Sequence, residues 1–162
     1  MSGDTATGLV DHFAGKVTFV REVALKYRKP RRTASIDAIL SADQAAEFMR
    51  RILPDNVREH FLALFLDGRN QVVSYFIAAT GTANSCPVGA REVFQAAVIA
   101  GAISLVVGHN HPSGQTVASP EDKDTTRRLR EAGELLGIPV LDHLIIGAEQ
   151  FFSFRQSGQF GV

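Results

Sequence analysis

The chain has 162 residues, of which 45% are hydrophobic and 21% are charged, values typical of one soluble globular domain. Its 17 basic side chains balance its 17 acidic ones, which argues against a global charge that would draw the protein to nucleic acid or to a membrane surface. The single cysteine, Cys86, excludes internal disulfides and multi-cysteine zinc sites.

Three features favour a cytoplasmic protein that makes no contact with a membrane. A lone thiol suits a reducing compartment. The first residues lack the basic start and apolar run of a signal peptide. Apolar stretches stay well short of the ~20 residues that a membrane-spanning helix needs.

The N-terminal residues 1–34 are expected to form a tail with a basic linker or an edge strand, ahead of a main domain over 35–162. Residues 16–27 alternate apolar and polar side chains, as an exposed strand does. Residues 26–32 form a basic run broken by Pro30. We interpret this run as a solvated linker rather than a nucleic-acid contact, because it lacks interleaved aromatic side chains beyond its second residue.

The remaining sequence alternates between helical and strand patterns. Ser41 and Gln44 give the S-x-x-Q signature of a helix start, and residues 67–70 read as a hairpin turn. In chain order the predicted elements are helix 41–53, strands 60–66 and 71–79, helix 90–100, strand 103–107, helix 119–136, and strands 140–146 and 150–154. This order predicts an α/β fold in which helices pack on the faces of a mixed β-sheet.

The polar segment that begins at Gly108 carries the strongest indication of chemistry. His109 and His111 follow the buried strand 103–107, and residues i and i+2 of an extended chain point to the same side. Asp122 lies in the first turn of the next helix and can supply a carboxylate oxygen. Two neutral nitrogens and one carboxylate, with a fourth position left open, are typical of a catalytic zinc site.

Simpler interpretations exist for parts of this pattern. Ser119-Pro120-Glu121-Asp122 is also an ordinary helix start, with Ser119 as the cap and Asp122 facing the helix dipole.

The pair Asp142–His143 is interpreted as two alternating strand residues, one packed and one polar, rather than as a catalytic pair. Other metal hydrolases are excluded, because the chain is too short for an eight-fold barrel and lacks the H-E-x-x-H and cysteine-pair signatures.

The spacing His109-x-His111, seven residues, Ser119, two residues, Asp122 resembles the JAMM metal motif of the JAB/MPN domain family. HNHPSG, the following SPED and the later LGIPVLDHLIIG are similar to its RadC-like branch, over about residues 42–154. The resemblance implies the cytidine-deaminase-like JAB/MPN fold and the catalytic-type domain alone, without the helix-hairpin-helix segment of longer RadC proteins. It also implies one Zn²⁺ per chain, held by His109, His111 and Asp122, and hydrolysis of peptide or isopeptide bonds by a metal-activated water.

The same resemblance implies roles for two more side chains. Ser119 would hydrogen-bond the developing oxyanion, and Glu59, just before the strand 60–66, stands where the family has its general base. Glu92 is the rival base, on the helix before the metal strand, where Gly89-Ala90-Arg91-Glu92 replaces the His-Pro-Arg-Glu frequent in relatives. Asn110 and Ser113 are expected to orient the loop or the histidines from behind the ligands.

Two alternative functions remain at this point. The first is a metal-binding module without turnover in DNA repair or mobile-element metabolism, although the neutral net charge argues against strong duplex binding. A metal-dependent nuclease is the other alternative, but such sites favour more carboxylates and harder ions. We therefore expect a peptide or protein substrate, with DNA association as the weaker possibility.

Overall fold

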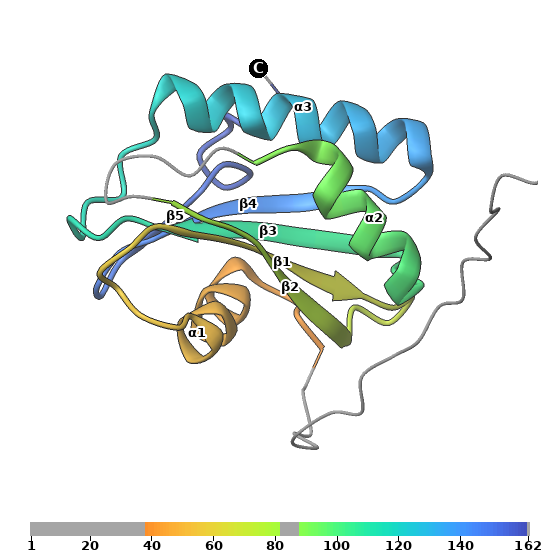
Figure 1. The fold of residues 1–162 in the computed structure, drawn as a ribbon, viewed down its shortest axis with the longest axis horizontal. Helices are drawn as coiled ribbons and strands as arrows, with labels where there is room; N and C mark the ends of the chain where they lie inside the picture. The colour runs from red at the N-terminus through yellow and green to blue at the C-terminus, as the bar shows by residue number, and fades with distance from the viewer. Residues whose placement is uncertain (1–37, 82–87, 162) are drawn as a thin grey trace, which may run out of the picture. The chain divides into compact units, whose positions relative to one another are not determined.

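Five strands form one mixed sheet with helices on both faces in the computed structural model, which describes residues 38–81 and 88–161 (Figure 1). The elements are α1 (Ala42–Ile52), β1 (His60–Leu66), β2 (Val72–Thr80), α2 (Ala90–Ala100), β3 (Ser104–Asn110), α3 (Pro120–Leu136), β4 (Val140–Ile146) and β5 (Phe151–Ser153). The strand order is β2-β1-β3-β4-β5, with β3 and β4 parallel and the other neighbours antiparallel. The predicted α/β architecture is confirmed.

Helix α1 covers one face of the sheet (Figure 1). The Ser41 side chain caps it by accepting the backbone N–H of Gln44. Small residues and Met49 on its inner side are fully buried against strands β1, β3 and β4. Met49 reaches so close to the sheet that a Cβ built on Gly108 would lie 2.5 Å from the methionine sulfur. Glycine at position 108 therefore allows α1 to pack directly on β3.

Helices α2 and α3 cover the opposite face (Figure 1). Their contacts with the sheet are made by buried residues that include Phe94 of α2, Leu129 of α3 and Phe61 of β1. With helices on both faces, every residue of β1 and β3 is buried. This burial on both faces explains why residues 61–66 of β1 and 105–107 of β3 are continuous apolar runs rather than alternating ones.

Strand β3 is longer than the sequence indicated. The predicted strand 103–107 ended before a polar segment that begins at Gly108, but β3 continues to Asn110. His109 pairs with Phe61 of the neighbouring strand, and both His109 and Asn110 are only 1% exposed. The polar side chains stay in the strand because the sheet buries them and other groups satisfy their hydrogen bonds. His109 therefore lies inside a rigid strand, and only His111 follows its end.

Several sequence predictions concern residues outside the described ranges. They are the possible strand 16–27, the basic run 26–32 and Cys86. The division at residue 34 also stays a prediction. Across the described ranges, helices of the length and apolarity needed to cross a membrane are not found.

Candidate metal centre

The candidate metal ligands meet where β3 ends and α3 begins. His109 comes from the strand, His111 from the residue just beyond it, and Asp122 from the first turn of the helix. One donor atom from each lies within 4.8 Å of the other two. The chain therefore brings together three groups that are 13 residues apart at most.

The distances between the donor atoms suit a small tetrahedral ion. The Nε2 atoms of His109 and His111 are 3.0 Å apart, and Nε2 of His109 lies 3.1 Å from Oδ1 of Asp122. Nε2 of His111 lies 3.9 Å from Oδ2 of the same carboxylate. Zinc bonds of about 2.0–2.1 Å in tetrahedral geometry hold ligand atoms about 3.4 Å apart. Small movements would bring all three donors to that spacing.

The second nitrogen of each imidazole is already engaged. Nδ1 of His111 lies 2.8 Å from the backbone carbonyl of Gln115, which can only accept, so Nδ1 carries the proton and Nε2 keeps its lone pair. Nδ1 of His109 lies 3.0 Å from Nε2 of His143. In both rings Nε2 therefore faces the candidate metal position while Nδ1 is held from behind, as is usual for metal-binding histidines.

His143 and Thr126 were not singled out as site residues from the sequence. His143 does alternate with Asp142 along β4, but both are buried, at 0% and 7% exposure, and His143 contacts the candidate ligand His109. Thr126 lies 2.6 Å from Nδ1 of His143 and also donates to the carbonyl of Asp122. The four-residue spacing of Asp122 and Thr126 on one helix face was the available signal.

Aromatic rings enclose the two buried histidines. His109 stacks on Phe61 with 5.9 Å between ring centroids, and His143 stacks on Phe154 at 4.9 Å. Burial, together with the nearby charge of His109, lowers the pKa of His143 well below its ordinary value. His143 is therefore a neutral ring with a fixed orientation.

Asp122 both caps helix α3 and presents an oxygen to the candidate metal position. Its Oδ2 accepts the backbone N–H and the hydroxyl of Ser119, at 2.8 and 2.7 Å, while the Ser119 oxygen accepts the N–H of Asp122. This is the capping box of α3, so the simpler interpretation of the segment holds. The other oxygen, Oδ1, faces His109. The helix cap thereby aims one carboxylate oxygen at the candidate metal position.

The charge state of Asp122 follows from these contacts. Burial alone would raise the pKa of this carboxyl. The hydrogen bond and charge of His109 and the hydrogen bonds from Ser119 outweigh burial and hold the pKa well below its usual range. Asp122 is therefore a carboxylate at neutral pH, which is the form that binds a cation.

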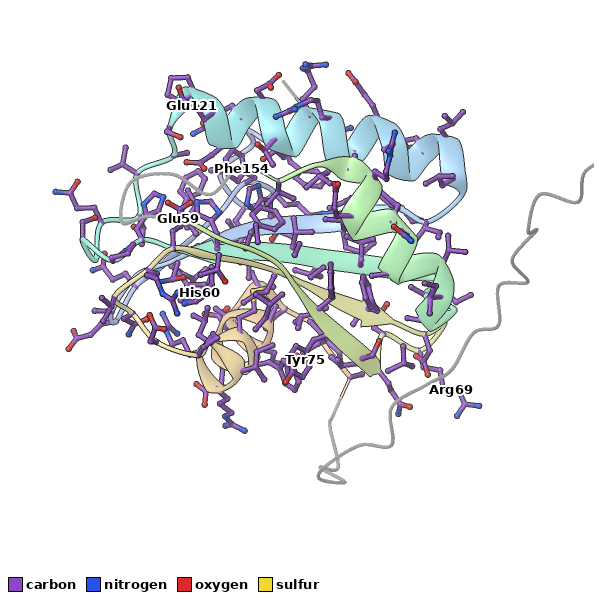
Figure 2. All side chains as sticks on the ribbon, in the orientation of Figure 1. Glu59, His60, Arg69, Tyr75, Glu121 and Phe154 are labelled. Atoms are coloured by element: carbon purple, nitrogen blue, oxygen red, sulfur yellow. The ribbon has the colours of Figure 1, made fainter. Side chains whose placement is uncertain are left out.

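Glu59 lies at the same end of the sheet. Figure 2 shows Glu59 on the α3 side of the sheet and His60 on the α1 side, as alternation along an extended chain requires. The Glu59 side chain is 9% exposed. Burial raises its pKa above the ordinary 4.5, although the charges of His109 and His111 oppose the shift. A raised pKa makes this carboxyl a stronger base than a solvated glutamate, as suits a group that accepts a proton.

Asn110 holds the backbone on both sides of Glu59. Its side-chain oxygen accepts the N–H of His60 at 2.8 Å, and its nitrogen donates to the carbonyl of Arg58 at 2.9 Å. Asn110 was expected to orient the loop or the histidines, and its actual contacts are with the segment that carries Glu59. Ser113 is exposed and accepts only a long bond, 3.4 Å, from the N–H of Gln115.

The rival Glu92 lies against the start of its own helix. It is exposed in the first turn of α2, and its carboxylate occupies the space that a Cβ on Gly89, the cap of its own helix, would fill. A carboxylate at the N-terminus of a helix interacts favourably with the helix dipole. The geometry therefore favours Glu59 over Glu92 as the group beside the candidate ligands.

Comparisons with known proteins cover most of the described residues. The model of the RadC-like JAB domain matches residues 39–159. A UPF0758 protein of Trichlorobacter lovleyi is 45% identical over 128 residues, which cover 79% of this chain and 56% of the relative. A UPF0758 protein of Geotalea uraniireducens is 44% identical over 137 residues, 85% of this chain and 60% of the relative. This chain thus spans less than two thirds of the length of these relatives, and it belongs to the RadC-like JAB domain family.

Proposed function

We propose that the chain is a zinc-dependent hydrolase of peptide or isopeptide bonds. The observation that carries this proposal is the convergence of Nε2 of His109, Nε2 of His111 and Oδ1 of Asp122 at the end of β3. Two neutral imidazoles and one carboxylate favour zinc over magnesium or calcium, which prefer oxygen ligands. When bound, zinc acts as a Lewis acid and lowers the pKa of water towards ~7.

In this proposal Glu59 is the general base. Its buried carboxyl has a raised pKa, which makes it a stronger base than a solvated glutamate. It would take a proton from the attacking water and pass that proton to the leaving amine. The hydrogen bonds of Asn110 to the backbone of Arg58 and His60 hold Glu59 in place for both transfers.

Ser119 is the proposed donor to the oxyanion. Its hydroxyl donates to Asp122 in the structure, so the proton must turn towards the substrate oxygen when negative charge develops there. Backbone N–H donation from Ser119 to the same Asp122 oxygen keeps the carboxylate in place during this rotation. Loss of one oxyanion donor typically lowers kcat by about 10²–10³.

A cleavage assay with a matched pair of variants tests the proposal. Zinc-loaded protein is incubated with a library of peptides and isopeptide-linked peptides, and products are identified by mass spectrometry. We expect cleavage by the wild type and by Glu92→Gln, and loss of at least about 100-fold in rate for Glu59→Gln with its zinc retained. Full activity in Glu59→Gln would remove this residue from the mechanism. Cleavage that survives complete removal of zinc would contradict the proposal.

The same assay separates this proposal from the alternative of a metal-binding module without turnover. Such a module would hold zinc through the same three ligands but cleave none of the library members. The DNA association attached to that alternative depends on the basic run 26–32, which lies outside the described residues. Salt-sensitive DNA binding that is lost when this run is neutralised would support the alternative.

A further inference from the structure

We propose that Thr126 and His143 are positioning residues that keep a proton on Nδ1 of His109, so that Nε2 is the nitrogen left to bind the metal. The inference rests on the metal site of the proposed function and deepens it. Neither residue is among the three candidate ligands. Both act on the site through hydrogen bonds, and together they link one ligand to another through the protein interior.

Hydrogen bonds link the backbone carbonyl of Asp122 to Thr126, Thr126 to His143, and His143 to His109. The carbonyl determines which group donates in each of them. The carbonyl of Asp122 can only accept, so the single proton of the Thr126 hydroxyl is donated to it at 2.6 Å. Thr126 must then accept from Nδ1 of His143, which lies 2.6 Å from the hydroxyl oxygen. A neutral His143 that carries its proton on Nδ1 has a lone pair on Nε2.

The last bond sets the state of His109. Nε2 of His143, as an acceptor, requires the proton of His109 to be on Nδ1, 3.0 Å away. The remaining nitrogen of His109, Nε2, lies between Nε2 of His111 and Oδ1 of Asp122, so Nε2 is the nitrogen that can give its proton up to a metal ion while Nδ1 keeps its own. The order of donors therefore runs from His109 through His143 and Thr126 to the backbone of Asp122.

Packing fixes the orientation of the imidazole rings of His109 and His143. His109, His143 and Thr126 are 1%, 0% and 3% exposed. The two rings are stacked on Phe61 and Phe154, so a ring flip would have to disturb the aromatic contacts as well as the hydrogen bonds. Figure 2 shows Phe154 beneath α3, on the sheet face that carries this helix. The hydrogen bond at Nδ1 is in place before any metal arrives, which is a condition for a preorganised site.

Thr126→Val and Thr126→Ser form a matched pair that tests the inference. Valine keeps the shape of threonine but removes its hydroxyl, whereas serine keeps the hydroxyl. Zinc affinity is measured by competition with a chromophoric chelator, with no substrate present. We expect affinity about 10–100-fold weaker for Thr126→Val and within about threefold of the wild type for Thr126→Ser. Wild-type affinity in a folded Thr126→Val would overturn the inference.

Nuclear magnetic resonance of the metal-free wild type tests it without any variant. Long-range ¹⁵N–¹H correlations report which nitrogen of each histidine is protonated. We expect His109 to carry a proton on Nδ1, with this proton lost in Thr126→Val and kept in Thr126→Ser. A wild-type His109 whose Nδ1 carries no proton would contradict the inference. A wild type that binds no zinc would instead defeat the proposed function, so the two failures are distinguishable.

Discussion

The side-chain oxygen of Asn110 lies 2.8 Å from the backbone nitrogen of His60, on the strand next to its own. Asn110 thereby takes the place of a backbone acceptor at the point where β3 ends, and its nitrogen donates to the carbonyl two residues earlier, at Arg58. The residue between these two contacts is Glu59. A side chain adjacent to both candidate histidines thus fixes the segment of the proposed base rather than the histidines.

Asn110→Ala should destabilise the protein without releasing zinc. The change leaves the N–H of His60 and the carbonyl of Arg58 without their partner, and such losses typically cost about 1–3 kcal/mol. Ser113→Ala is the control, because Ser113 is exposed and accepts only a long bond. Urea unfolding should show a clear loss for Asn110→Ala and a change within about 0.5 kcal/mol for Ser113→Ala. Equal losses would show that Asn110 does not hold this segment.

Glu59→Gln should make the metal-free protein more stable at neutral pH. A carboxyl with a raised folded pKa binds more protons folded than unfolded, so its contribution to stability falls as pH rises from 4.5 through the raised value. Glutamine removes this penalty. Thermal unfolding in chelator should show a higher Tm for Glu59→Gln than for the wild type at pH 7, with the difference shrinking as pH approaches 4. Glu92→Gln, an exposed change, should leave the Tm nearly unaltered.

Asp122→Asn should have the opposite effect on the metal-free protein. The folded pKa of Asp122 is held low, so its contribution is present above the unfolded pKa and is lost as pH falls through the folded value. Hydrogen bonds to a charged group are worth about 1.5–3 kcal/mol, and we expect a loss of this order at pH 7. The difference in unfolding free energy between variant and wild type should begin to shrink as pH falls below about 4, the unfolded pKa of aspartate, and should go on shrinking towards the lower folded pKa. A pH-independent difference would assign the effect to the helix cap alone.

Gly108→Ala should destabilise the sheet on which His109 lies. The added Cβ would meet the sulfur of Met49 at 2.5 Å and the carbonyl of Leu144 at 3.2 Å, and overpacking of this kind costs about 1–3 kcal/mol. In a Met49→Ala background the same change should cost less, because the flexible neighbour is gone. A double-mutant cycle measures this coupling, expected between about 0.5 and 3 kcal/mol. Strict additivity would contradict the close packing of α1 on β3.

The sequence was informative where a short-range pattern determined the structure. The helix that begins after Ser119 follows from its capping signature, and the strand at His60 follows from its apolar run. Each of these two signals lies within one short stretch of the chain. The spacing of His109, His111 and Asp122 was equally readable, because a strand end and the next helix start bring these residues together.

The contacts behind the ligands depend on partners far along the chain. His143 is 34 residues from His109, and Asn110 is 52 residues from Arg58. Their roles follow from which strands are neighbours, and β1, β3 and β4 became neighbours only in the folded sheet. The same long-range pairing explains why β3 extends to Asn110, since His109 has Phe61 beside it. Short-range sequence patterns do not indicate which strands will pair.

Zinc content is the most direct test of the central claim, that His109, His111 and Asp122 hold one ion. Purified protein is stripped with chelator, reconstituted with zinc, dialysed and measured by elemental analysis. We predict about one zinc per chain in the wild type and in Ser119→Ala, which weakens the helix cap but keeps all three ligands, and far less in Asp122→Ala. Zinc content in Asp122→Ala equal to that of the wild type would contradict the account.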